Sequence, residues 1–579
     1  MRLAKCLALL DECVKSRAIR DGKRVHAHMI KAHCLQPIYL QTKLIIFYVK
    51  CDLLCNARHL FDQMHDRTVV SWTAMISGYT QKGLSSEGLN LFLLMLRSDA
   101  EPNEFTLSTI LSSCTGVTGL ALGRQIHGLV IRRNYKSNLF VGSALLDMYA
   151  KAGRINEARG IFEDLPERDV VSCTAIISGY AQQGWDEEAV ELFRKLLLEG
   201  MASNYVTYAS LLTALSGLAA LDLGKQVHNH VLRMELLSNV VLTNALVDMY
   251  AKCGNLNYAR KVFESTSERT IVSWNAMLVG YCKHGMARDM LELFDMMRSE
   301  NKIQPDSVTI LAVLSGCSHG KLENKGLQIF DEMLNGKFNV QPKVEHYGCV
   351  VDLLGRAGQL KRALQFTKQM PFLPTAAIWG SLLGACRMHG NIEIGEIVGH
   401  HLLEIEPENA GNYVILSNMY ASAGRWEDVR NLRAMMQEKA VVKEPGRSWI
   451  EIGQTLHTFH ANDRSHPRRE EIMAKVQWLS TEFKKIGYMP DLSCVLYDVD
   501  KEQKEKIVLG HSEKLALAFG LIALSDGAPI RVIKNLRICA DCHEFAKCLS
   551  KLYGLEVSLR DKSRYHHIIG GLCSCGDYW

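Results

Sequence analysis

One phrase of eleven residues returns along this chain at a constant spacing. VVSWTAMISGY at 69–79 comes back as VVSCTAIISGY at 170–180 and as IVSWNAMLVGY at 271–281. The three copies begin 101 residues apart (170 − 69 and 271 − 170), and two other phrases keep the same period. Such a period indicates stacked structural repeats, which bury together an apolar face that no single repeat can bury alone.

Each period divides into units of about 35, 35 and 31 residues. In the unit 69–103, an apolar helix is expected first and Gly83 interrupts it. A second helix then carries Leu89, Phe92 and Met95 at three-residue spacing. The pattern predicts a right-handed α-solenoid of helix–turn–helix repeats.

The alternation of unit lengths resembles the PLS class of pentatricopeptide-repeat proteins. A tetratricopeptide-like scaffold is the rival interpretation, but its aromatic and glycine signature is absent. Repeats of the resembling class would span residues 1–375, and two degenerate units resembling E-type motifs would span 376–443. The expected units are short repeats at 38–68, 139–169, 240–270 and 344–375, standard repeats at 69–103, 170–204 and 271–306, long repeats at about 2–37 and at 104–138, 205–239 and 307–343, and degenerate units at 376–409 and 410–443.

A histidine recurs with the same period in the long repeats. His26, His127 and His228 have apolar neighbours on an expected helix. Because every period carries one, packing between repeats explains these histidines better than a ligand or catalytic role.

A different chemistry begins after Lys443, where the repeated phrases stop. His511-Ser512-Glu513 opens an apolar helix at 514–522, a strand-like stretch follows at 529–536, and Cys539-Ala540-Asp541-Cys542 opens another helix. This order is typical of the zinc-dependent nucleobase deaminases. A C-x-x-C motif by itself equally fits a structural zinc site or a thioredoxin-like motif, and Ile538 stands where the deaminase signature has proline.

These residue types suit hydrolytic deamination. One histidine nitrogen and two thiolates can hold zinc tetrahedrally and leave the fourth position to water. Zinc lowers the pKa of that water, and a glutamate beside it can move protons. Attack at carbon 4 of cytosine with loss of ammonia would give uridine.

The last residues add a second cluster. His543, the run Tyr565-His566-His567 and the ending Cys573-Ser574-Cys575-Gly576-Asp577-Tyr578-Trp579 resemble the DYW deaminase domain. The resemblance covers 444–579 and implies an α/β cytidine-deaminase-like zinc domain with two zinc ions. The implied catalytic site has His511, Cys539 and Cys542 as ligands and Glu513 as proton shuttle. The implied structural zinc has as ligands His543, Cys573, Cys575 and one of His566 and His567.

The resemblance also implies which side chains contact RNA. In this family the fifth and last residues of a repeat face one base, and an apolar second residue packs on its ring. Aspartate only accepts hydrogen bonds and suits uracil and guanine at the last position, whereas asparagine also donates and suits adenine and cytosine. At the fifth position, a short hydroxyl leaves room for a purine and the longer asparagine reaches a pyrimidine. The packing residues would be Val70, Phe140, Val171, Val241 and Val272.

Five repeats carry informative pairs. The long repeats, with Ser108, Ala209 and Leu311 at the fifth place, are expected to discriminate little. Family members bind RNA in parallel, with the last short repeat four nucleotides before the edited base. The expected contacts, counted from the edited cytidine, are Thr73 and Asn103 with adenine at −12, Ser143 and Asp169 with guanine at −10, Thr174 and Asn204 with adenine at −9, Asn244 and Thr270 with a pyrimidine at −7, and Asn275 and Asp306 with uracil at −6.

Composition is compatible with this interpretation. The net charge of +5 is mild, and no apolar run approaches the 18 residues of a membrane span. Five of the 18 cysteines crowd between Cys539 and Cys575, which suggests metal because nothing resembles a secretory signal. No transit peptide is visible in this chain.

The sequence therefore predicts a monomeric, site-specific cytidine-to-uridine RNA editing enzyme. The resemblance implies single-stranded organellar RNA and multiple organellar RNA editing factors as partners. Family frequency favours the mitochondrion over the chloroplast. The alternative is a non-catalytic RNA-binding factor for processing, stability or recruitment of a separate deaminase, with structural zinc only. The intact Glu513 favours the enzyme.

Overall fold

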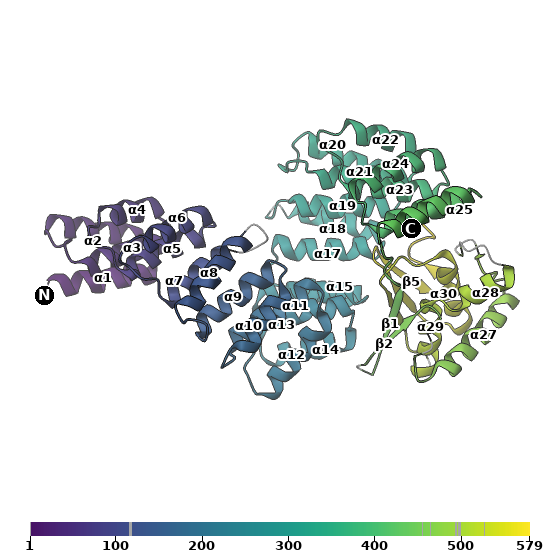
Figure 1. Ribbon diagram of the computed structural model, residues 1–579, viewed down its shortest axis with the longest axis horizontal. Coiled ribbons are helices and arrows are strands. Elements are labelled where there is room, and N and C mark those ends of the chain that lie inside the picture. The colour runs from purple at the N-terminus through teal and green to yellow at the C-terminus, as the bar shows by residue number, and fades with distance from the viewer. Residues whose placement is uncertain are drawn as a thin grey trace. The chain divides into compact units, whose positions relative to one another are not determined.

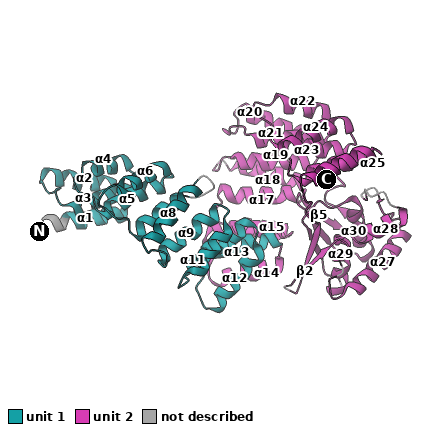
Figure 2. Cartoon of the chain, in the orientation of Figure 1, with its two compact units in different colours: residues 1–218 teal, residues 219–579 magenta. Residues whose placement is uncertain are grey.

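The computed structural model describes residues 2–578 except 115–118, 301, 454, 464, 493–494, 496–499 and 526 (Figure 1). Trp579, the last residue of the C-terminal motif, lies outside the described residues. The chain divides into two compact units, 1–218 and 219–579 (Figure 2).

Unit 1 is built of antiparallel helix pairs. From residue 38 onward, the first helix of each pair begins at the first residue of an expected repeat. The helices are α1 (Arg2–Ser16), α2 (Ile19–Lys31), α3 (Ile38–Lys50), α4 (Leu54–Gln63), α5 (Val69–Gln81), α6 (Ser85–Leu96), α7 (Glu104–Ser113), α8 (Leu120–Arg132), α9 (Leu139–Lys151), α10 (Ile155–Asp164), α11 (Val170–Gln183), α12 (Asp186–Leu198) and α13 (Tyr205–Leu218).

In several repeats the side chain of the last residue caps the first helix of the next repeat, as those of Asn103, Asn138 and Asp169 do. The side chain of Asp169 accepts a hydrogen bond from the backbone N–H of Ser172. The Ser172 hydroxyl in turn accepts one from the backbone N–H of Asp169. Such a reciprocal capping box satisfies two backbone donors that have no partner within the helix. The repeat boundaries are therefore local features that the sequence already encodes.

Unit 2 continues with helix pairs that begin at the expected residues. The repeated His228 lies here, and its Nδ1 is 2.8 Å from the hydroxyl of Tyr250, which confirms a packing role. The helices are α14 (Leu221–Arg233), α15 (Val240–Lys252), α16 (Leu256–Ser265), α17 (Ile271–Lys283), α18 (Ala287–Ser299), α19 (Ser307–His319), α20 (Glu323–Leu334), α21 (Val344–Arg356), α22 (Leu360–Gln369), α23 (Ala376–Met388), α24 (Ile392–Ile405), α25 (Ala410–Ser422) and α26 (Trp426–Glu438), with a short 3-10 helix at Leu236–Ser238.

The C-terminal part of unit 2 is an α/β domain with one sheet, in the strand order β2-β1-β3-β4-β5-β6. Among the described strands, β3 and β4 pair in parallel, with Ile530 opposite Val557, and the other neighbouring pairs are antiparallel. The helices pack on the sheet around buried apolar side chains such as Phe483 and Phe545. The strands are β1 (Arg447–Ile452), β2 (Thr455–His460), β3 (Ile530–Lys534), β4 (Val557–Arg560), β5 (Tyr565–Ile569) and β6 (Leu572–Cys573), and the helices are α27 (Arg469–Lys485), α28 (Lys501–Leu509), α29 (Ser512–Ala523) and α30 (Ala540–Tyr553).

The expected order of helix, strand and helix around the two motifs is confirmed. His511 occupies the N-cap position of α29, and Cys539 occupies the N-cap position of α30. Strand β3 lies between these two helices in the chain, so the fold can bring both helix starts to one place.

Candidate nucleic-acid interface and candidate metal centre

Large apolar side chains are exposed at the second position of the repeats. The five expected packing residues are between 56% and 64% exposed, Phe140 most of all. Apolar side chains of this size usually lie buried, so their exposure at the same position of repeat after repeat suggests that they contact a ligand. The exposed fractions are Val70 56%, Phe140 64%, Val171 58%, Val241 56% and Val272 56%.

The second residues of the long repeats are exposed as well, which was not predicted from the sequence. Phe105, Val206 and Val308 are the second residues of three long repeats and are 54%, 39% and 49% exposed. Phe105 also contacts Phe140, with 5.9 Å between the ring centroids. The signal was present in the sequence, because the same rule of position applies to long repeats as to the others.

Four of the expected base-reading residues line one groove in unit 1. Ser143 and Asp169, from one repeat, and Thr174 and Asn204, from the next, surround it together with exposed apolar side chains such as Phe140. Polar groups at fixed places between apolar walls are what a base needs, because its faces stack and its edges form hydrogen bonds.

In unit 2 the expected pairs lie within hydrogen-bond reach. Asn275 Nδ2 donates to Asp306 Oδ1 at 3.0 Å, and Asn244 Nδ2 lies 3.5 Å from Thr270 Oγ1. Burial acts to raise the pKa of Asp306, but hydrogen bonds from Thr309 and Asn275 outweigh it and hold that pKa below its usual value. The carboxylate is therefore an acceptor at neutral pH.

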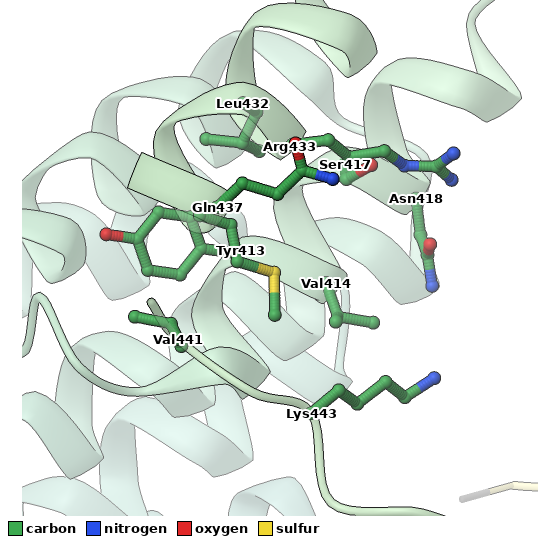
Figure 3. Close-up of a pocket in the computed structure, with 10 residues that line it drawn as sticks. Tyr413, Val414, Ser417, Asn418, Leu432, Arg433, Gln437, Val441 and Lys443 are labelled. Atoms are coloured by element: carbon green, nitrogen blue, oxygen red, sulfur yellow. The ribbon is translucent and has the colours of Figure 1, made fainter. Parts of the chain in front are cut away.

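A further cavity lies at the C-terminal end of the helical pairs (Figure 3). Tyr413 and Leu432 contribute to its lining, as do Val414 and Lys443. Val414 and Lys443 are the fifth and last residues of the degenerate unit 410–443, so the cavity occupies the place where earlier repeats would face a base.

The first metal cluster joins the two helix starts. His511 Nδ1 lies 3.5 Å from Cys539 Sγ and 3.4 Å from Cys542 Sγ. Nitrogen and sulfur ligands of a tetrahedral zinc ion are about 3.6 Å apart, so the cluster fits zinc. Burial first, and then the Cys539 sulfur, raise the pKa of Cys542 well above its usual value. A bound cation would reverse this by deprotonating the thiol.

Glu513 is buried next to this cluster, with 3% of its surface exposed. Its Oε2 lies 2.9 Å from Lys534 Nζ and accepts from Ser512 Oγ at 3.1 Å. Lys534 also donates to Ser512 Oγ at 2.7 Å. A buried carboxylate needs such partners, and together they fix its position. Lys534 could not be identified from the sequence, because its approach to Glu513 depends on how β3 packs beside α29.

The second cluster contains His543, His566, Cys573 and Cys575. Cys573 Sγ lies 3.8 Å from His566 Nδ1, and Cys575 Sγ lies 3.4 Å from His543 Nε2. The structure thus brings His566 into the cluster and leaves out His567, whose Nδ1 lies 2.8 Å from Ser558 Oγ. Alternation along β5 explains the difference, because successive side chains of a strand point to opposite faces.

A buried ion pair braces the start of α29 against the start of α30. Lys514 Nζ lies 2.5 Å from Asp541 Oδ2, and both side chains are fully buried. Tyr488 donates to Asp541 Oδ1 at 2.7 Å, and Lys514 donates to the Tyr488 hydroxyl at 3.1 Å. Lys514 follows Glu513 and Asp541 lies between the two cysteines, so the pair ties together the segments that carry the first cluster.

None of the helices in the described part of the chain combines the length and apolar character that a membrane span needs.

Fold and clusters together define a helical-repeat protein with a deaminase-type metal domain. Family models agree with this class. The DYW family of nucleic acid deaminases matches 487–579, and the E motif matches 389–451. The PPR repeat family matches 67–116, 168–217 and 269–319, and a second PPR repeat model matches 143–170 and 241–269.

Relatives extend over the full chain. A mitochondrial pentatricopeptide repeat-containing protein of Arabidopsis thaliana is 66% identical, covering 99% of this chain and 91% of the relative. The chloroplastic protein CRR2 of the same plant is 40% identical, covering 98% and 87%. The chain belongs to the pentatricopeptide-repeat proteins of the PLS class and DYW subgroup.

A solved structure supports the fold of the repeats. The pentatricopeptide repeat protein PPR10 of maize, in complex with an 18-nt psaJ RNA element, matches with a TM-score of 0.53 at 20% identity. The match covers 71% of this chain and 62% of that chain. At this identity the likeness shows the solenoid fold alone.

The buried ion pair generates a first prediction. Replacing Lys514 by methionine leaves the Asp541 carboxylate buried without its charge partner, which costs about 3–5 kcal/mol. Hydrogen exchange of α29 and α30 peptides in the full chain should therefore show a lower free energy of local opening. The exposed Lys506, paired with Glu502, is the matched control, and its replacement by methionine should leave the exchange unchanged. Unchanged protection in Lys514→Met would contradict the bracing role.

Proposed function

We propose that this protein binds single-stranded organellar RNA through its repeats and deaminates one cytidine of that RNA to uridine. One observation carries the proposal. His511, Cys539 and Cys542 converge from two helix starts, and the buried Glu513 lies two residues from the histidine. A metal-ligand set with a neighbouring carboxylate is the arrangement that hydrolytic base deamination requires.

Zinc held by His511, Cys539 and Cys542 would supply a water that is acidic enough to react near neutral pH. The Lys534 and Ser512 contacts fix Glu513 through Oε2, and we assign proton transfer to Oε1. Glu513 would accept a proton from that water as the water oxygen adds to carbon 4 of cytosine. Its carboxyl group would then return the proton to the leaving amino group, so that cytidine and water would give uridine and ammonia.

The repeats would select the cytidine. The exposed second residues hold the bases by stacking, and the fifth and last residues recognise their edges. The groove between Ser143, Asp169, Thr174 and Asn204 supports this assignment for two neighbouring bases. We keep the register in which the last short repeat lies four nucleotides before the edited base.

The second cluster would hold a structural zinc ion through His543, His566, Cys573 and Cys575. Its four donors close the tetrahedron and leave no position for water, as is usual for structural zinc. Two zinc ions per chain are therefore proposed.

One observation favours the non-catalytic alternative. Glu513 already forms a buried ion pair with Lys534, and such a pair also has a place in a domain retained for its shape. In that case the protein would bind RNA and recruit a separate deaminase.

For location we propose the mitochondrion, because the 66% identical relative is named as mitochondrial, although other relatives are named as chloroplastic. We further propose that the protein is a monomer on RNA and that multiple organellar RNA editing factors bind its long repeats.

Glu513→Gln separates the two functions. The amide keeps the shape of the carboxylate but cannot accept the proton, so editing should fall at least a hundredfold. RNA affinity and zinc content should stay unchanged. The measurement is the fraction of uridine at the target site of an RNA incubated with purified protein and with any editing factors that activity requires. Glu502→Gln, an exposed change on α28, is the matched control. Near wild-type editing by Glu513→Gln would refute the catalytic assignment.

Removing the second cluster should remove one metal ion. In the full chain, Cys573→Ser with Cys575→Ser should lower zinc from two ions to one and lower the melting temperature of the C-terminal domain. Elemental analysis measures the metal. Cys548 on α30 is buried but lies outside both clusters, so Cys548→Ser should keep two ions. A single zinc ion in the folded wild-type protein would argue against the second site.

The expected RNA sequence can be tested by selection from a random pool. Adenine at −12, guanine at −10, adenine at −9, a pyrimidine at −7 and uracil at −6 should be enriched. Asn275→Thr should shift −6 from uracil toward guanine, because the shorter side chain leaves room for a purine while Asp306 still accepts a hydrogen bond. Gln328→Thr changes an exposed residue of a second helix and should shift nothing. Loss of preference at −12, −10, −9 and −6 together would refute the register.

A further inference from the structure

Three buried threonines connect the pairs of base-reading residues. Thr106, Thr207 and Thr309 are each the third residue of a long repeat, and none has exposed surface. The hydroxyl of each lies within 2.7 Å of the fifth residue of the preceding standard repeat. Each hydroxyl also lies 2.9–3.1 Å from Oδ1 of the last residue of that repeat.

Around Thr207, helix capping decides which atom of Asn204 faces the groove. Asn204 Oδ1 accepts from the backbone N–H groups of Val206 and Thr207, at 2.9 and 3.0 Å, and from the Thr207 hydroxyl at 3.1 Å. Backbone N–H groups can only donate, so the atom they contact must be the amide oxygen. The Asn204 Nδ2 amide group is then the part that can donate to a base.

Counting hydrogens fixes the orientation of the neighbouring hydroxyl as well. Thr207 has one hydroxyl hydrogen and gives it to Asn204 Oδ1. The hydrogen in the 2.7 Å contact between Thr174 and Thr207 therefore comes from Thr174. Thr174 is left with acceptor lone pairs, and the two residues present an acceptor next to a donor. Adenine offers the complementary N6–H donor and N1 acceptor, whereas guanine offers the reverse.

Around Thr309 a similar set of hydrogen bonds reverses the order of donor and acceptor. Asp306 Oδ1 already accepts from the Thr309 N–H at 2.8 Å and from Asn275 Nδ2 at 3.0 Å. The Thr309 hydroxyl is closest to Asn275 Oδ1, at 2.7 Å, and engages that oxygen. The remaining N–H of Asn275 and Oδ2 of Asp306 present a donor next to an acceptor, which complements the O4 and N3–H of uracil.

We propose that Thr106, Thr207 and Thr309 are specificity-determining positioning residues, whose hydroxyls set the donor and acceptor polarity that each standard repeat presents to its base. The inference rests on the proposed RNA-binding function. The long repeats provide a contrast, because the last residue of one, Asn138, caps Val141, whose side chain has no hydroxyl. The weak discrimination expected of long repeats then has a structural cause.

The test compares Thr207→Val with Thr207→Ser in the full-length protein. Valine keeps the shape of threonine and removes the hydroxyl, whereas serine keeps the hydroxyl. Affinities are measured for four RNAs that differ only at −9, and for four that differ only at −12. The valine variant should lose roughly three- to tenfold of the adenine-over-guanine ratio at −9, the effect of one hydrogen bond. The serine variant should keep that ratio, and both variants should keep the preference at −12.

The outcomes distinguish this inference from the proposed function. If the wild-type protein shows no preference at −9 or at −12, the base-reading assignment itself is wrong. If the wild type prefers adenine at −9 and a folded Thr207→Val keeps the full ratio, the positioning role is overturned. Should Thr207→Val fail to fold, Thr309→Val and Thr309→Ser repeat the test with the uracil preference at −6. A full uracil preference in folded Thr309→Val would equally overturn the inference.

Discussion

Burial of apolar surface between neighbouring repeats is the constraint on which the rest of the solenoid depends. A pair of helices such as α5 and α6 cannot bury its apolar stripe alone, so each pair packs against the next one. Stacking in a fixed register brings the same position of successive repeats to the same face. The second residues, such as Val70 and Phe140, are exposed in successive repeats for this reason.

Helix capping connects that packing to recognition. Backbone donors at the start of a helix need acceptors, and the last residue of the preceding repeat provides one at Asn103, Asp169, Asn204 and Asp306. One side-chain oxygen of each of these residues is thereby occupied by the cap, and the other polar atom of the side chain remains available to a base. A change from asparagine to aspartate keeps the cap and alters the hydrogen bonds offered to RNA. A substitution at the last residue of a repeat can therefore change which base is preferred without changing the stability of the fold.

Much of this could be predicted from the sequence, because the repeat period and the caps are local signals. The phrases that recur every 101 residues predicted correctly where the first helix of each repeat begins. The order of the two motifs predicted the succession of α29, β3 and α30. The choice between His566 and His567 could not be made from sequence, since it depends on which face of β5 turns toward α30. The contact of Lys534 with Glu513 could not be predicted from the sequence either, because it depends on the packing of β3 against α29.

The two histidine and cysteine clusters are linked to each other. The N-terminal turn of α30 supplies Cys542 to the first cluster and, at the next residue, His543 to the second. Asp561 connects them again, because its Oδ2 lies 3.4 Å from the N–H of Ile538 and 3.8 Å from His566 Nε2.

Burial acts to raise the pKa of Asp561, but the neighbouring His566 and hydrogen bonds from Ser563 and Arg564 hold it well below its usual value. The ionised carboxylate orients His566 and supports the turn that precedes Cys539, as outer partners of metal ligands commonly do. Loss of the second cluster would thus leave the first without part of its support, which is a physical reason for the two clusters to lie next to each other.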